Sequence, residues 1–126
     1  MADDKVESKL TYYEAVGRRK NATARVRLYV AKEETAVING VTVAKGECIV
    51  NGIPAEKYFP GEVSKKIYLE PFRTTNTIGR FVTSILLTGG GHAGQLGATI
   101  HGIARALEKT DKEKFRPILK KRGFMT

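Results

Sequence analysis

The sequence is poor in the residues on which membrane, disulfide-bonded and metal-binding proteins depend. It has no Trp, two His and a single cysteine, Cys48, among 126 residues. One cysteine cannot form an internal disulfide and is typical of a reducing compartment, so we expect a cytoplasmic protein. No apolar run approaches the ~18 residues that span a bilayer, and the acidic N-terminus lacks the apolar stretch of a secretory signal. These features exclude a membrane protein and a disulfide scaffold.

Acidic residues are also scarce, and the basic residues are concentrated. The chain has 22 Lys and Arg against 13 Asp and Glu, which gives a net charge of +9. Six basic residues and no acidic one lie between Ala15 and Lys32. Six more, with only Glu113 among them, lie between Lys112 and Arg122. Such runs repel themselves, so they favour a polyanionic partner, although a solvated surface is the simpler alternative for any one run.

Turn residues and alternating apolar residues predict one folded domain over residues 11–126, after a flexible lead-in at 1–10. Strands are expected at 11–17, 22–30, 47–50 and 80–88. The first of them ends at Gly17, and the last is apolar enough to be central in a sheet. The Asn39-Gly40 pair predicts a hairpin turn inside an extended segment at 32–45.

Helical spacing and capping residues predict helices at 54–59, 64–69 and 94–109, the second of them stopped by Pro71. A last helix is expected to start at a capping box, Thr110–Glu113, and to end at Gly123. Strands come first and the long helices last. This order predicts an α+β fold with two layers, in which a mixed, mainly antiparallel β-sheet has helices packed on one face.

Two of these elements carry polar residues on a defined face. The strand at 22–30 has an apolar side formed by Ala24, Val26, Leu28 and Val30. Arg25, Arg27 and Tyr29 lie on its other side. The helix at 94–109 has one expected buried stripe, formed by Leu96, Ile100, Ile103 and Leu107. His101 and Arg105 are four residues apart and share a face outside this stripe.

A glycine-rich turn lies between the strand at 80–88 and the helix at 94–109. Gly89, Gly91 and Gly94 match the dinucleotide-binding pattern G-x-G-x-x-G. We reject that function because Asp111, at the required distance, starts a helix and no second parallel strand follows. A helix N-terminus after glycines can still hold a phosphate through the N–H groups of Gly90, Gly91, Ala93 and Gln95. A tight turn without a ligand is the alternative.

Catalytic and metal-binding patterns are weak. His92, His101 and Cys48 do not have metal-ligand spacing, so no metal and no cofactor are expected. The sequence shows no nucleophile–base grouping, and we do not expect an enzyme. A phosphate-handling enzyme built on Gly89–Gly94 remains the competing class, and saturable nucleotide binding would favour it. A basic protein held on an anionic membrane is disfavoured because no amphipathic basic helix has a large exposed apolar face.

Four stretches resemble one family closely. They are VGRRKNATARV at 16–26, IVNGIPAEKYF at 49–59, GGGHAGQLGA at 89–98 with HGIARAL at 101–107, and LKKRGF at 119–124. Together they are similar to bacterial-type small-subunit ribosomal protein nine. The resemblance covers residues 12–126, nearly the whole chain, and the four stretches occur in the order that the family has.

The resemblance implies a primary binder of ribosomal RNA in the head of the small subunit, with neighbouring head proteins as partners. It implies an α+β fold with a left-handed β-α-β crossover, a fold also found in some small-molecule kinases. The RNA-binding residues that it implies agree with those chosen from charge and backbone chemistry: Arg18, Arg19, Lys20, Arg25, Arg27, Gly89, Gly90, Gly91, Gln95, His101, Arg105, Lys120, Lys121 and Arg122.

The sequence departs from the family pattern in two places. The segment at 32–45 is longer than the family's usual turn, and we expect a surface extension there. Family members also continue past the Gly-Phe-x-Thr stretch into a basic tail that reaches transfer RNA in the peptidyl site. The sequence given ends at Thr126, so a transfer-RNA contact is expected only where such a tail exists.

Overall fold

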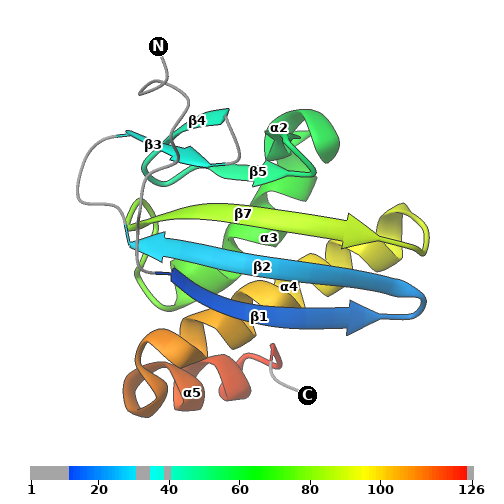
Figure 1. The fold of residues 1–126 in the computed structure, drawn as a ribbon. Coiled ribbons are helices and arrows are strands. Elements are labelled where there is room, and N and C mark those ends of the chain that lie inside the picture. The colour runs from blue at the N-terminus through cyan, green and yellow to red at the C-terminus, as the bar shows by residue number, and fades with distance from the viewer. Residues whose placement is uncertain (1–11, 31–34, 39–40, 125–126) are drawn as a thin grey trace.

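The computed structural model describes residues 12–30, 35–38 and 41–124, without the side chains of 35–38, 41, 42 and 92. The expected lead-in at 1–10 therefore lies outside the described residues. The described residues form a sheet of five strands, a two-stranded hairpin and four helices, arranged as in Figure 1. The strands are β1 (Tyr12–Arg19), β2 (Ala22–Val30), β3 (Thr35–Ile38), β4 (Val41–Ala44), β5 (Cys48–Val50), β6 (Ile53–Pro54) and β7 (Phe81–Thr88). The helices are α2 (Ala55–Tyr58), α3 (Glu62–Thr74), α4 (His92–Thr110) and α5 (Lys112–Lys121).

The main sheet is mixed and mainly antiparallel, as predicted. Its order is β1-β2-β7-β5-β6, with β7 in the centre. Only β5 and β7 are parallel. In Figure 1 both strands run to the right, and β7 lies below β5. The chain passes from β5 through α3, behind the sheet, and enters β7. This connection is a left-handed crossover. The smaller sheet is β3 paired antiparallel with β4. Asn39 and Gly40 lie between these strands, outside the described residues.

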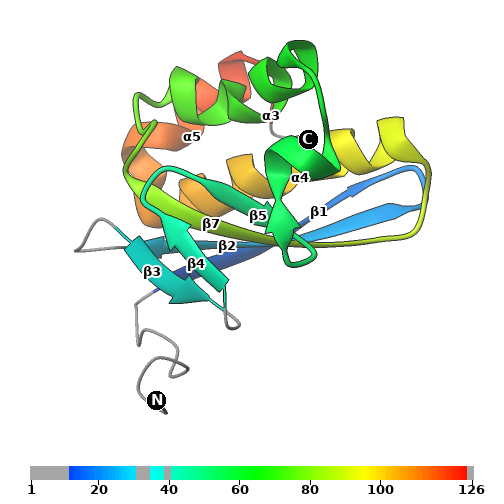
Figure 2. The same cartoon turned by 90° about the horizontal axis from the view of Figure 1, so that it is seen from above.

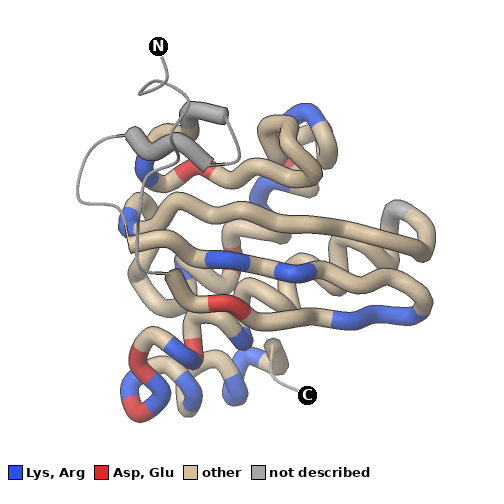
Figure 3. The backbone as a smooth tube through the Cα atoms, in the orientation of Figure 1, with Lys and Arg blue, Asp and Glu red and all other residues tan. Residues whose placement is uncertain are grey.

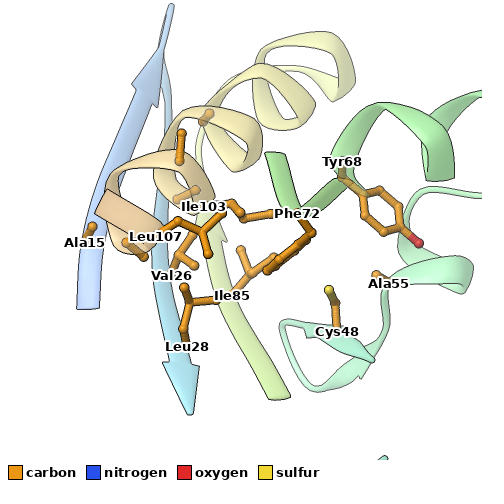
Figure 4. Close-up of a cluster of buried hydrophobic side chains, with 14 of the residues drawn as sticks. Ala15, Val26, Leu28, Cys48, Ala55, Tyr68, Phe72, Ile85, Ile103 and Leu107 are labelled. Atoms are coloured by element: carbon orange, nitrogen blue, oxygen red, sulfur yellow. The ribbon is translucent and has the colours of Figure 1, made fainter. Parts of the chain in front are cut away.

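The helices cover one face of the sheet, and no described helix covers the other face of β1, β2 and β7, which we call the open face (Figure 2). The core lies between the two layers, where side chains of β2 and β7 meet those of α3 and α4, as Figure 4 shows. The strand β2 alternates as predicted, since Ala24, Val26 and Leu28 are fully buried. Its end does not follow the pattern. Tyr29 is buried on the open face against the Tyr12 ring, 5.3 Å away, and Val30 is exposed.

The contact between α4 and the hairpin of β1 and β2 depends on small residues. Gly17, expected to end a strand, lies inside β1, and a Cβ there would come within 2.2 Å of the Ala98 oxygen and the Gly102 nitrogen. Helix and strand backbones therefore touch. The expected stripe on α4 holds only in its second half, because Ile103 and Leu107 are fully buried while Leu96 and Ile100 are half-buried.

Two helix ends differ from the prediction. Pro71 does not stop α3, which continues to Thr74 because Pro71 and Phe72 are buried and Thr75 donates from both its N–H and its hydroxyl to the Pro71 carbonyl. The N-cap of α5 is Asp111 and not Thr110. The Asp111 carboxylate accepts from the Lys114 N–H at 3.2 Å. Gly123 ends α5 with φ +84°, as expected.

Candidate nucleic-acid interface

The tip of the β1–β2 hairpin carries three adjacent basic residues. Arg18 and Arg19 end β1, and Lys20 lies in the two-residue turn that follows. All three side chains are exposed. Lys20 has φ +57°, a left-handed conformation that is costly for a residue with a side chain. No ion pair involves these residues within the described part of the chain. Figure 3 shows the resulting run of positive charge at this end of the sheet. We call these three residues the tip cluster.

The glycine turn packs directly against the tip of this hairpin. Gly89 and Gly90 have φ of +73° and +67°. A Cβ at Gly89 would lie 2.4 Å from the Asn21 oxygen, and one at Gly90 would lie 2.9 Å from the Ala22 nitrogen. Only glycine fits at both positions, for its conformation and for its size. The turn, the N-terminus of α4 and the tip cluster therefore form one continuous surface.

Gln95 holds this turn in place. Its side-chain amide donates to the Gly89 carbonyl at 3.1 Å, and its side-chain oxygen accepts from the Tyr58 hydroxyl at 2.9 Å. Its backbone N–H donates to the Gly91 carbonyl at 2.8 Å. The expectation that this N–H is available to a phosphate is therefore wrong, because it belongs to the first turn of α4. Tyr58, which the sequence analysis did not select, joins α2 to the glycine turn.

The two arginines of β2 lie on the open face of the sheet, as predicted, but they are paired. Glu14 of β1 stands opposite Arg27 in the strand register. Its carboxylate accepts from Arg27 at 2.9 Å and from Arg25 at 3.5 Å. The hydrogen bond from Arg27 is the main reason that the pKa of Glu14 lies below its ordinary value. Arg27 also lies over the Tyr12 ring, 4.7 Å from its centre.

The edge of β1 is covered by basic side chains from α4. Arg105 donates to the Val16 carbonyl at 3.2 Å, and Lys109 donates to the Glu14 carbonyl at 2.6 Å. Both use the outward-facing carbonyls of an edge strand, which would otherwise be free to pair with another chain. Lys109 was not among the predicted residues. Its i,i+4 spacing from Arg105 on the helix face was the available signal.

The basic residues at the end of α5 have mixed surroundings. Lys120 and Lys121 are exposed, and within the described residues neither forms an ion pair. Arg122 donates to Glu70 of α3 at 2.9 Å, and Arg73 pairs with the same carboxylate group at 2.8 Å. Part of the positive charge in this run therefore serves to join α5 to α3.

An open groove connects the hairpin tip to the C-terminal segment. Its volume is about 420 Å³, and its walls include Arg18, Arg19, Leu96, Ile100, His101 and Phe124. The groove brings Arg18 and Arg19 of the first basic run close to Gly123 and Phe124, which follow the second basic run in the sequence. His101 is half-buried in its wall. We call this feature the tip groove.

Other functional groups in the described residues are few. No group of three or more His, Cys, Asp or Glu there could hold a metal ion. Burial raises the pKa of the Cys48 thiol to about 12, so the thiol stays protonated in the core. None of the helices in the described ranges is both long and apolar enough to cross a membrane.

Comparison with known proteins identifies the family of this chain. The family model described as ribosomal protein S9/S16 matches residues 17–126. A protein of Dehalococcoides mccartyi named small ribosomal subunit protein uS9 is 44% identical over 118 residues, which cover 94% of this chain and 79% of that protein. Proteins of the same name from Maridesulfovibrio salexigens and Anaeromyxobacter dehalogenans are 45% and 41% identical and cover 89% and 88% of this chain, each aligned over 75% of its own length. With a family match over most of its length and several such relatives, the chain belongs to the ribosomal protein S9 family.

Proposed function

We propose that this protein is a structural constituent of the small ribosomal subunit and binds ribosomal RNA in the head of that subunit. Family membership supports the first part and the expectation that the protein is not an enzyme. The observation that carries the second part is the tip cluster, three exposed basic residues that form no ion pair with any described residue, beside a glycine turn and a helix N-terminus. An unneutralised cluster of this kind is the electrostatic footprint of a phosphate backbone.

Binding by this surface is mainly electrostatic. Arg18, Arg19 and Lys20 pair with phosphates, and the N–H groups at the start of α4 add hydrogen bonds. The RNA is recognised chiefly by its shape and its backbone, since these contacts carry no base identity. Lys120 and Lys121 extend the same charge along the C-terminal helix.

Several predicted residues act by holding this surface in position. Gln95 fixes the glycine turn through Gly89, and Arg105 fixes the edge of β1 through Val16. Arg25 and Arg27 contribute to RNA binding only in part, because they share the carboxylate of Glu14. Gly89 and Gly90 allow the close approach of the turn to the hairpin, and Gly91 is the N-cap residue of α4.

Salt dependence tests the proposed mechanism. The full chain is titrated onto an in vitro transcript of the head domain of small-subunit ribosomal RNA. If it neutralises six to ten phosphates, the affinity falls roughly 10³- to 10⁵-fold between 50 and 200 mM salt. A nearly flat salt dependence would contradict charge neutralisation. Nucleotide binding that RNA does not displace would favour the phosphate-handling alternative.

The remaining partners follow from the same proposal. Neighbouring proteins of the small-subunit head contact the protein in the assembled particle, and the extension expected at 32–45 is proposed as one point of contact. Contact with transfer RNA in the peptidyl site requires a basic C-terminal tail. In this proposal the protein acts in the ribosome, in the cytoplasm.

A further inference from the structure

The tip groove differs from the rest of the basic surface because large apolar residues make up much of its lining. Leu96, Ile100 and Phe124, together with Ile67 of α3, are the large apolar residues of its lining, and we call this apolar part the floor. Arg18 and Arg19, both exposed, are the charged part of its lining, and we call this part the rim. None of the residues that line it is acidic. The groove therefore combines an apolar surface with positive charge at its edge, a combination that phosphate contacts alone do not need.

Arg19 lies along the helix surface at this groove. A Cβ at Gly97 would come within 2.9 Å of the Arg19 Cγ, so the absence of a side chain at Gly97 lets the Arg19 stem lie flat on α4. The groove also reaches Ala93, in the first turn of α4, beside the glycine turn. The floor, the rim and the proposed phosphate site are contiguous.

We propose that the tip groove binds one unpaired nucleotide of RNA, with its base on the apolar floor and its phosphate at Arg18 and Arg19. This inference rests on the proposed function and names the RNA feature that the site recognises. A base-paired duplex presents phosphates and sugar hydroxyls, but its bases are stacked inside the helix. Only an unpaired base can offer a flat apolar face to Leu96, Ile100 and Phe124.

Charge complementarity favours RNA over a protein segment as the occupant. Every nucleotide carries a flat base and a negatively charged phosphate. The base can contact the floor of the groove while the phosphate pairs with the arginines of the rim. The volume of about 420 Å³ lies in the range of sites that hold small ligands. A protein segment would need an acidic residue beside a large apolar one to achieve the same match, and it becomes an alternative outcome of the test.

The test compares two RNA hairpins that differ by one unpaired nucleotide. One hairpin is fully paired, and the other carries a single bulged 2-aminopurine, whose fluorescence reports a change in base stacking. The wild-type chain is expected to bind the bulged hairpin about tenfold more tightly, the size of effect that stacking of one base gives. Its 2-aminopurine fluorescence is expected to change on binding.

Two variants locate the effect. Ile100→Glu places a negative charge on the floor, and Phe124→Ala removes the aromatic ring from it. Both are expected to bind the two hairpins equally. Ile78→Glu is the matched control, since Ile78 is 52% exposed and does not line the tip groove. It is expected to keep the preference of the wild type. Circular dichroism melts establish which variants are folded, and Phe124→Ala remains informative if Ile100→Glu unfolds.

Three outcomes would overturn the inference. Wild-type protein that binds both hairpins equally, with affinity that falls as salt rises, would contradict the nucleotide site and leave the proposed function intact. A preference that survives in both folded groove variants would place the base elsewhere. An acidic, aromatic peptide that Ile100→Glu releases, without any preference between hairpins, would assign the groove to a protein. Absence of binding to either hairpin and to the head-domain transcript would instead contradict the proposed function.

Discussion

The two groups of basic residues on the β1–β2 hairpin differ in what neutralises them. At the tip, Arg18, Arg19 and Lys20 are exposed and form no ion pair with any described residue. In the middle of β2, Arg25 and Arg27 share the carboxylate of Glu14. Both groups look alike in the sequence, where no acidic residue separates them. The comparison shows that, among the described residues, the charge without an ionic partner lies at the tip, and this is where the proposed RNA binding should be strongest.

The largest expected effect follows from removing the tip cluster. Changing Arg18, Arg19 and Lys20 together to Gln is expected to lower affinity for the head-domain transcript about 100-fold at low salt. The measurement is filter binding with the full chain. The matched control changes Lys45, Arg80 and Lys112 to Gln, which removes equal charge from exposed positions elsewhere. Equal losses in the two variants would show that only the net charge matters.

A smaller effect is expected from pushing the glycine turn away from the tip. Gly90→Ala places a Cβ 2.8 Å from the Ala22 Cβ at a φ of +67°. We expect a loss of about 2 kcal/mol in the free energy of unfolding, from strain and crowding. Gly91→Ala, where nothing lies within 4 Å of a Cβ, is the control and is expected to change stability by less than about 0.5 kcal/mol. Urea titration measures both, and similar values would contradict the close contact.

Changes to Glu14 and the two arginines that it pairs with are expected to alter RNA affinity still less. Removal of the Glu14 carboxylate is expected to raise that affinity. Glu14→Gln removes the carboxylate that neutralises Arg25 and Arg27, so affinity for the transcript is expected to rise about threefold. Changing both arginines to Gln is expected to lower it by less than about tenfold. The same filter-binding assay measures both variants. If Glu14→Gln weakens binding, the expectation is wrong. The carboxylate would then position Arg25 and Arg27 for RNA and would not compete with RNA phosphates for them.

The pH dependence of stability is the smallest effect. The hydrogen bond and charge of Arg27 hold the pKa of Glu14 below its ordinary value of 4.5. This pairing stabilises the folded chain above about pH 4.5, and the stabilisation is lost as the pH falls through the lowered pKa. The ion pair is partly exposed, so we expect less than about 1 kcal/mol. Urea unfolding at several pH values, compared with Glu14→Gln, measures it, and a contribution that grows below pH 4 would contradict the pairing.

Local sequence patterns predicted most of the elements of this fold. The alternation in β2 placed Arg25 and Arg27 on the open face, and Gly123 marked the end of α5. Pro71 misled the prediction for α3, because burial of Pro71 and Phe72 outweighs the lost hydrogen bond. Gly17 misled it for β1, because the glycine serves a contact with Gly102 that lies far away in the sequence. Tertiary packing decided both cases.

The candidate site was predictable as a list of residues but not as an arrangement. Charge density selected Arg18, Arg19 and Lys20. Pairing of Arg27 with Glu14 depends on the β1–β2 register, which the spacing of the residues along the chain does not reveal. Tyr58 reaches Gln95 only because α2 and α4 meet beside the glycine turn. The tip groove is built from four separate segments, and no pattern within any one of them indicates it.

The most direct test of the account is lysine labelling in native small ribosomal subunits. Lysines of this protein are acylated with a small reagent in intact subunits and in the free chain, and the rates at single residues are compared by mass spectrometry. We predict that Lys20 reacts about tenfold or more slowly in the subunit, because an ion pair with a phosphate blocks its amine. If Lys20 reacts equally fast in both states, the hairpin tip does not bind RNA and the central claim is wrong.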